Sequence, residues 1–272
     1  DQKIQPFAKH VAAAIRSEQI DAVSKNLQLS IPAFESMRAH GMTYVIDPSS
    51  AYATMSENPL AIDYVQFPRQ TLDFRAGDCD DLTACFCALM ESLGVQTAFI
   101  TIPGHIYAAV ALEINADTAR NAFYRPEDLI FSEDGTVWVP VEITMLETDF
   151  VEAWITGAKQ WREHRMRDQA QLYPTREGWA AYNPVAFNIS DVRISSLPDT
   201  TVAEKFGESL NRFVKREIAD RELKLKARIQ TSQDKARDIN KLGVLYARYG
   251  LMDDALSQFT SAVNIRPYEL AL

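Results

Sequence analysis

The spacing of apolar residues predicts helices near the N-terminus and again in the middle of the chain. Over residues 4–38, apolar side chains recur every three to four positions in two blocks, the period of helices that cover a core. The same period returns over residues 79–93 and stops at Gly94, which predicts one buried helix with a glycine at its end. Further helices are expected over residues 150–168 and 174–182.

Three β-rich runs between these helices predict an antiparallel sheet. They cover residues 97–102, 106–114 and 136–143. Pro103-Gly104 joins the first two runs and Asp134-Gly135 precedes the third, and both dipeptides are typical of tight turns. Because short turns join antiparallel neighbours, we expect an α+β fold in which the later helices cover the sheet.

Two stretches lack a regular period. A short β-rich run at residues 43–46 ends at Asp47-Pro48, and a polar irregular segment then reaches Arg75. Loops of this length are often functional. The pattern fails again over residues 184–198, ahead of a long charged amphipathic helix expected over residues 202–230.

The charge distribution adds a domain boundary near residue 200. The 272 residues include 28 Lys and Arg and 37 Asp and Glu, and the net charge of -9 argues against broad nucleic-acid binding. Residues 204–237 alone carry ten Lys and Arg and six Asp and Glu, so the rest of the chain is the more acidic part. We therefore assign residues 1–200 to one domain and residues 201–235 to a helical linker, a solvated spacer with no partner of its own.

Eight residues near the end of the chain follow the alternation of small and large side chains that two packed helices need. They are Ile239, Leu242, Gly243, Tyr246, Ala255, Phe259, Ala262 and Pro267. The pattern resembles a tetratricopeptide repeat over residues 236–272, with a plain helical hairpin as the alternative. One repeat cannot bury its own face, so it is expected to lean on the preceding helix or to begin an array that continues beyond Leu272. Because such arrays bind peptides or proteins, we expect a protein partner here.

The cysteines add candidate chemistry. Cys79, Cys85 and Cys87 lie within nine residues of one another, a spacing that fits neither a disulfide framework nor a zinc site. Cys79 lies at the expected helix start, with Asp78 as the candidate N-cap. Free N–H groups and the positive dipole end at a helix start lower the pKa of a thiol, which makes Cys79 the candidate nucleophile. Cys85 and Cys87 fall inside the apolar helix and are expected to pack in the core.

Acidic residues around Cys79 allow a different interpretation. Asp80 and Asp81 are common residue types in the first turn of a helix and need no further role. A metal site formed by Asp78, Asp80 and Asp81 is a weaker hypothesis, because no second group of ligands accompanies them. We expect neither a metal nor another cofactor.

Two further residues complete a possible thiol site. His105 is the only histidine of the central region and begins a predicted strand, where a general base could lie at the edge of a cleft. Glu142 is a carboxylate inside an apolar predicted strand, where an unpaired charge would be costly. A nucleophile at a helix start, a base and an acid that orients the base are the parts of a cysteine acyl-transfer site. Taken singly, each of the three residues also fits a buried structural role.

Four short motifs carry a resemblance to a known family. They are Gly77-Asp78-Cys79-Asp80-Asp81-Leu82, Leu93-Gly94-Val95, Gly104-His105-Ile106 and Trp138-Val139-Pro140-Val141-Glu142-Ile143-Thr144. Over about residues 62–145 the chain resembles the bacterial transglutaminase-like branch of the papain-type cysteine enzymes. The resemblance implies a papain-like or transglutaminase-like fold, with Cys79, His105 and Glu142 as the catalytic triad. The chain departs from the family at the acid, because Glu142 stands where an Asp is usual.

The resemblance also implies an activity. The reaction would be thiol-dependent acyl transfer or hydrolysis on peptide or glutamine amides, as in a cysteine peptidase, an amidase or a transglutaminase. Its substrate would be a peptide or protein, and Gln66 in the preceding loop is the candidate oxyanion donor, with a surface glutamine as the alternative. The alternative function is an inactive scaffold that binds partner proteins through the same fold and the repeat.

The sequence gives little information on location. The longest nearly uncharged stretch, residues 93–112, is broken by Gly94, Pro103 and Gly104, so no transmembrane helix is expected. The chain starts without the basic and apolar regions of a signal peptide, so such a leader is expected to be absent or already removed. The compartment stays open, and a periplasmic location as part of a longer protein is one expectation.

Overall fold

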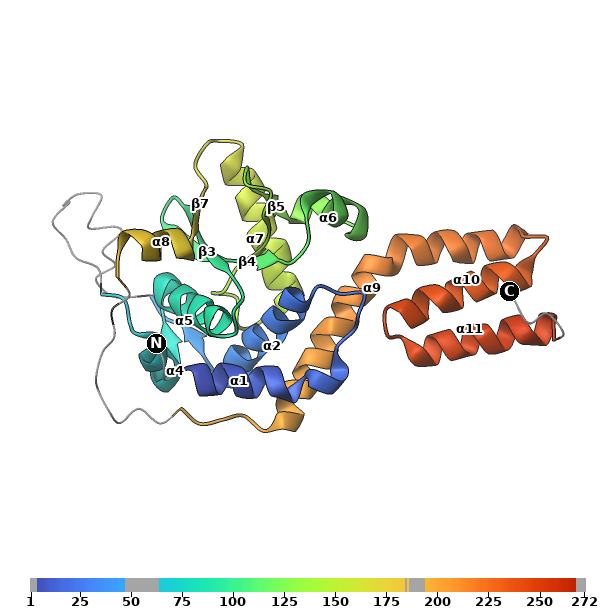
Figure 1. Ribbon diagram of the computed structural model, residues 1–272, viewed down its shortest axis with the longest axis horizontal. Helices are drawn as coiled ribbons and strands as arrows, with labels where there is room; N and C mark the ends of the chain where they lie inside the picture. Colours follow the sequence, from blue (N-terminus) through green and yellow to red (C-terminus); the bar gives the residue numbers. More distant parts are fainter. Residues whose placement is uncertain (1–3, 47–63, 184, 186–193, 268–272) are drawn as a thin grey trace.

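The computed structural model describes residues 4–46, 64–183, 185 and 194–267, and it combines helices with antiparallel strands (Figure 1). The helices are α1 (Gln5–Ala14), α2 (Lys25–Ala39), α4 (Pro68–Phe74), α5 (Cys79–Ser92), α6 (Ala116–Ala122), α7 (Phe150–Arg165), α8 (Thr175–Ala181), α9 (Asp199–Thr231), α10 (Lys235–Arg248) and α11 (Met252–Ile265). The strands are β1 (Thr43–Tyr44), β2 (Ala76–Gly77), β3 (Thr97–Ile102), β4 (His105–Leu112), β5 (Ile130–Phe131), β6 (Val137–Val141) and β7 (Gln171–Pro174). This mixed architecture is compatible with the expected α+β class.

Five strands form one sheet in the order β5-β6-β4-β3-β7, and all neighbouring pairs are antiparallel. Side chains alternate between its two faces. On β4, Ala108 and Val110 belong to the main core, whereas Tyr107 belongs to a smaller cluster on the opposite face. That smaller cluster includes Trp138 of β6 and packs against Trp161 of α7. Because both faces are covered, the strands form nearly continuous apolar runs in the sequence.

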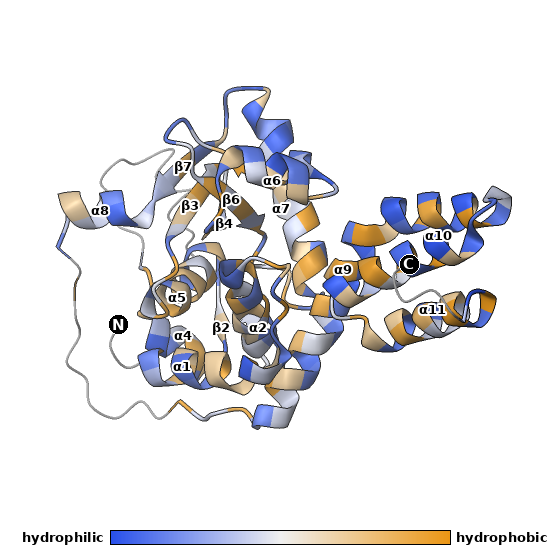
Figure 2. Cartoon of the chain, turned by 45° about the vertical axis from the view of Figure 1, so that its right-hand side comes forward, coloured by the Kyte–Doolittle hydropathy of each residue, from blue (hydrophilic) through white to orange (hydrophobic). Residues whose placement is uncertain are grey.

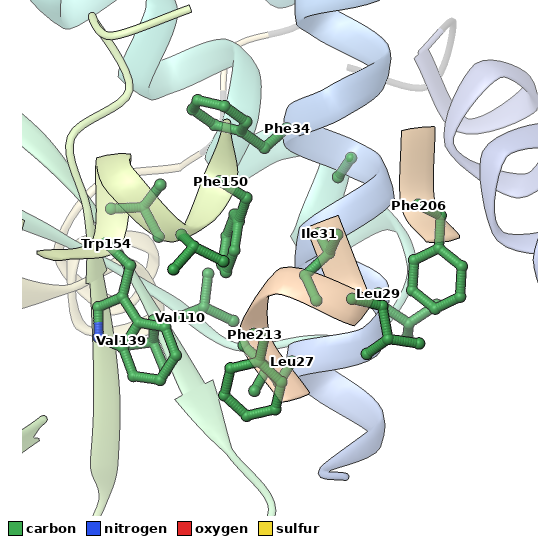
Figure 3. Close-up of a cluster of buried hydrophobic side chains, with 14 of the residues drawn as sticks. Leu27, Leu29, Ile31, Phe34, Val110, Val139, Phe150, Trp154, Phe206 and Phe213 are labelled. Atoms are coloured by element: carbon green, nitrogen blue, oxygen red, sulfur yellow. The ribbon is translucent and has the colours of Figure 1, made fainter. Parts of the chain in front are cut away.

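The main core joins helices that are far apart in the sequence (Figure 3). Phe34 of α2 meets Phe150 of α7 edge to face, with ring centroids 5.9 Å apart. Trp154 of α7 stacks on Phe213 of α9, with centroids 5.8 Å apart. Phe206, fully buried on α9, lies on the side of that helix that contacts α2. Helices α2, α7 and α9 therefore share one core above the sheet.

Helix α9 does more than connect two parts of the chain. Its buried apolar side chains, which all join the main core, are Val202, Phe206, Leu210, Phe213, Val214 and Ile218. Glu35 of α2 also binds it, because its carboxylate accepts hydrogen bonds from the Ser209 hydroxyl at 2.6 Å and from the Phe150 N–H at 3.0 Å. The predicted linker thus includes a segment that is built into the N-terminal unit. None of the described helices, α9 included, has the length and apolar composition needed to cross a membrane.

Helices α10 and α11 form a hairpin that packs against the second half of α9 (Figure 1). Gly243 of α10 lies against the ring of Phe259 on α11, and a Cβ at this glycine would be only 2.6 Å from that ring. This is the contact of small and large residues that the sequence pattern predicts. Hydrophobic and hydrophilic residues both occur along the visible side of these helices (Figure 2). Leu256 and Val263 of α11 leave 66% and 50% of their surfaces exposed.

Some elements differ from the sequence-based prediction. The irregular segment before Arg75 contains α4, whose Pro68 starts the helix and whose Gln70 side chain accepts the N-cap N–H of Phe67. The third predicted strand ends at Val141, because Glu142 turns its backbone N–H to α7 instead of to the sheet. The edge strand β7 has no apolar alternation and forms by pairing with β3. The irregular stretches predicted over residues 47–63 and 186–193 lie outside the described residues.

Candidate active site

Helix α5 begins at Cys79, directly after the predicted N-cap. Asp78 Oδ1 accepts hydrogen bonds from the N–H groups of Asp80 at 3.2 Å and Asp81 at 3.4 Å. Asp81 Oδ2 accepts in turn from the Asp78 N–H at 3.4 Å, which completes a capping box. Gly77 fits this arrangement because a Cβ there would lie 2.6 Å from the Asp81 Cβ. The half-buried thiol of Cys79 therefore lies on a fixed helix start.

The start of α5 is tied to the start of β4, which carries His105. The Thr83 hydroxyl, one turn after Cys79, lies 2.5 Å from the Cys79 carbonyl oxygen and 3.4 Å from the Ile106 carbonyl oxygen. Gly104 has a φ of 74°, so a glycine is favoured in the turn that leads into β4. The Cys79 thiol lies close enough to the His105 imidazole to help raise its pKa. The structure thus brings the predicted nucleophile and the predicted base together.

Glu142 contacts the same imidazole. Its Oε2 lies 2.8 Å from His105 Nε2. The register pairs Ala108 of β4 with Val141 of β6, so Glu142 follows on the diagonal from His105, where a long side chain is needed. Glu142 Oε1 accepts hydrogen bonds from the Thr144 N–H at 3.2 Å and from the Thr144 hydroxyl at 2.6 Å. Only 2% of Glu142 is exposed, so these protein groups replace water around the carboxylate.

Interactions within the site raise the pKa of His105 and lower the pKa of Glu142. Burial acts to lower the pKa of His105, but hydrogen bonds to Cys79 and Glu142, together with their negative charges, outweigh it and raise the pKa to about 9. Burial acts to raise the pKa of Glu142, but the hydrogen bond and positive charge of His105 and the hydrogen bonds from Thr144 lower it. At neutral pH the site therefore favours a carboxylate beside an imidazolium.

Helix α7 supports the segment directly after β6, which carries Glu142. The Glu142 N–H donates to the Ala153 carbonyl oxygen at 3.1 Å. Gly157, one turn further along α7, approaches so closely that a Cβ would lie 3.1 Å from the Glu142 backbone nitrogen. The Tyr107 hydroxyl donates to the Gly157 carbonyl oxygen at 3.1 Å, and its ring stacks on His105 with centroids 5.8 Å apart. These contacts fix the position of the acid and of one face of the imidazole.

Gln66 lies beside the same helix start. Its backbone N–H donates to Asp81 Oδ1 at 2.6 Å. Its side-chain Oε1 is buried and meets no hydrogen-bond partner within the described residues. The structure brings Gln66 to the first turn of α5, and its side-chain amide also carries the N–H donors that an oxyanion needs.

The acidic cluster has a structural use at this position. One carboxylate oxygen from each of Asp78, Asp80 and Asp81 lies within 4.8 Å of the others. The carboxylates of Asp78 and Asp81 accept backbone N–H groups, which is the helix-start role that the sequence also allows. We therefore derive no metal chemistry from them.

The other two cysteines are in the core, as expected. Cys85 is fully buried and Cys87 is 2% exposed. Burial raises the pKa of the Cys85 thiol far above its ordinary value and raises that of Cys87 to about 12. Both thiols therefore stay protonated and shielded under conditions in which a half-buried cysteine reacts.

Three residues near the site are absent from the sequence-based prediction. Thr83 looks like an ordinary helix residue, and its second contact depends on the packing of α5 on β4. Gly157 lies inside α7, so no turn motif in the sequence distinguishes it. Tyr44 lies in the short strand β1 opposite Gly77. Burial and the negative charges of Cys79 and Glu142 raise the pKa of its hydroxyl. Only the β-rich run at residues 43–46 could have drawn attention to Tyr44.

No protein family, curated protein or solved structure matches this chain. The interpretation of the site therefore rests on its own geometry. A half-buried thiol at a helix start, an imidazole beside it and a buried carboxylate behind the imidazole are the groups that acyl transfer needs as a nucleophile, a base and an orienting acid.

Proposed function

We propose that this protein is a thiol-dependent acyltransferase or hydrolase that acts on peptide or glutamine amides. Cys79 supplies the nucleophile, His105 moves the proton and Glu142 orients His105. The observation that carries the proposal is the hydrogen bond from His105 to the buried Glu142, with the thiol at the start of α5 near enough to help raise the pKa of His105. The raised pKa of His105, about 9, favours an imidazolium at neutral pH, and a neighbouring cation is one of the features that activate a catalytic cysteine.

The reaction follows from the positions of the three groups. The Cys79 proton goes to His105 Nδ1, since Nε2 is bound to Glu142. The Sγ lone pair forms a bond to the acyl carbon, and the carbonyl π electrons move to oxygen. As the oxyanion collapses, the C–N bond breaks, His105 protonates the leaving amine and a thioester remains. Water or an amine then attacks the thioester, gives its proton to His105 and releases the Cys79 thiolate, which yields hydrolysis or transfer.

The same contacts support the finer fold interpretation. A helix that carries the thiol at its N-terminus, packed on an antiparallel sheet with the base and the acid at neighbouring strand ends, is the arrangement of papain-like and transglutaminase-like enzymes. The contact of Gly243 with Phe259 supports one tetratricopeptide repeat in α10 and α11. We propose that this hairpin holds a protein partner or substrate, because apolar Leu256 and Val263 remain exposed on it.

Acylation of the enzyme tests this proposal. Reaction with p-nitrophenyl acetate should give a burst of p-nitrophenolate equal to the enzyme concentration, and peptide mass mapping should find one acetyl group on Cys79. The Cys79→Ala variant should lose both signals, whereas Cys87→Ala should keep them because Cys87 is in the core. Absence of a burst and of any modification at Cys79 would overturn the acyl-transfer proposal in favour of a binding module.

A second assay separates the two reactions. Benzyloxycarbonyl-glutaminyl-glycine with hydroxylamine gives a hydroxamate if the acyl group is transferred to an amine, and glutamate without hydroxamate if water is the acceptor. Acetylation of Cys79 without turnover of this dipeptide would retain the thiol mechanism and exclude this glutamine amide as substrate.

A further inference from the structure

Tyr44 lies next to the helix start that carries the thiol. Strand β1 pairs with β2 in parallel, and the register places Tyr44 opposite Gly77, two residues before Cys79. The pairing is held by the Thr43 N–H, which donates to the Arg75 carbonyl oxygen at 2.9 Å, and by the Val45 N–H, which donates to the Gly77 carbonyl oxygen at 2.9 Å. The backbone of Tyr44 is therefore fixed on both sides.

The Tyr44 side chain borders the site and reaches solvent. It is 39% exposed, so an incoming substrate can meet it. Burial of the remainder raises the pKa of its hydroxyl, and the negative charges of Cys79, Asp78 and Glu142 raise it further. The hydroxyl thus stays protonated at neutral pH and is available as a hydrogen-bond donor.

The helix start offers one further donor. Asp78 Oδ1 accepts the N–H groups of both Asp80 and Asp81, so these two are occupied. Within the described residues, no acceptor meets the N–H of Cys79 itself. When Sγ attacks a carbonyl carbon, the oxygen that becomes negative lies near this N–H, and a second donor is needed to bind it fully.

We propose that the Tyr44 hydroxyl is that second donor and binds the oxyanion formed when Cys79 attacks an acyl group. This inference rests on the proposed acyl transfer. During the attack the new S–C bond forms while the carbonyl π pair moves to oxygen, and Tyr44 donates its hydrogen bond without giving up its proton.

The Tyr44→Phe variant tests the proposal, because it removes only the hydroxyl. The rate of the p-nitrophenolate burst should fall by at least about 10-fold, since loss of one oxyanion donor slows acyl transfer by about 100-fold or more in a hydrolase with a less activated substrate. Alkylation of Cys79 by iodoacetamide proceeds by displacement at a saturated carbon and forms no oxyanion. Its rate should stay at the wild-type value. Tyr173→Phe, at an exposed position of the edge strand β7, is the matched control and should leave both rates unchanged.

Each other outcome has a distinct meaning. An unchanged burst rate in Tyr44→Phe would overturn the role of Tyr44. An equal loss of burst and alkylation rates would also overturn it, because the hydroxyl would then act on the thiol and not on the oxyanion. If the wild-type protein shows no burst although Cys79 is alkylated, the acyl-transfer proposal itself fails, and the inference on Tyr44 fails with it.

Discussion

Replacement of Glu142 by Gln removes the negative charge of the side chain and keeps its size. A glutamine of nearly the same size keeps an oxygen for the two hydrogen bonds from Thr144. Toward His105 it presents an amide N–H or a neutral oxygen in place of a carboxylate. An N–H donor would force Nε2 to accept and place the imidazole proton on Nδ1, where no base is left for the thiol. A neutral oxygen would stabilise the imidazolium much less.

The size of the effect follows from the pKa of His105. A rise from 6.5 to about 9 corresponds to about 3 kcal/mol of preference for the imidazolium in the folded site. Cys79 and Glu142 share this preference, so we expect Glu142→Gln to remove about half of it, on the order of 1.5 kcal/mol. The alkylation rate of Cys79 at pH 6.5 should therefore fall about 10-fold.

The effect on stability has a defined pH window. Because the folded protein raises the pKa of His105, the contribution of this group is fully present below about pH 6.5 and is lost as the pH rises through about 9. Because the pKa of Glu142 is lowered, its contribution is present above about pH 4.5 and is lost as the pH falls. The free energy of unfolding of Glu142→Gln should thus lie furthest below that of the wild type between about pH 4.5 and 6.5.

Urea unfolding and iodoacetamide labelling on the same samples measure both quantities. Glu35→Gln is the matched control, because Glu35 is 1% exposed and accepts hydrogen bonds from Arg38, the Phe150 N–H and Ser209 and none from His105 or Thr144. It should lose stability while Cys79 alkylates at the wild-type rate. If Glu142→Gln is folded and its Cys79 also alkylates at the wild-type rate at pH 6.5, the role of Glu142 in the triad is refuted.

Other variants address the supports of the site. His105→Ala should remain folded and slow Cys79 alkylation at pH 6.5, because the thiolate loses its cationic partner; an unchanged pH profile in the folded variant would separate the two residues. Gly157→Ala should lower the free energy of unfolding by about 1–3 kcal/mol in urea titrations, since its Cβ would press on the Glu142 backbone at 3.1 Å; wild-type stability would contradict this contact. Phe206→Ala should lower the free energy of unfolding by about 3–5 kcal/mol, because the fully buried ring belongs to the main core. A much smaller loss of unfolding free energy would show that α9 only connects two parts of the chain.

The local features of the site could be read from the sequence. An Asp before the first apolar-periodic residue is a common N-cap, so the start of α5 at Cys79 was predictable. The apolar runs predicted β3 with its observed bounds, and β4 with an error of one residue at its start and two at its end. The pairing of Glu142 with His105 was expected from the order of a nucleophile, a base and an acid, whereas its geometry depends on the register of β4 and β6.

The features that sequence reasoning missed depend on tertiary contacts. Strand β7 contains a glutamine and a proline and is ordered only by its partner β3. The apolar stripe of the charged helix α9 was visible in the sequence, but the sequence does not show that the stripe packs into the main core. Gly157 matters only because a strand passes close to it. In each case the decisive neighbour is distant in the sequence.

Site-resolved alkylation of the wild-type protein tests the central claim most directly. The folded protein is treated with limiting iodoacetamide between pH 5.5 and 9, quenched, digested and mapped by mass spectrometry. Modification should occur at Cys79 alone and already at pH 6.5, because it is half-buried at a helix start beside His105, whereas Cys85 and Cys87 are in the core. Modification of Cys85 or Cys87 ahead of Cys79, or no modification until the protein is denatured, would contradict the assignment of Cys79 as an activated nucleophile.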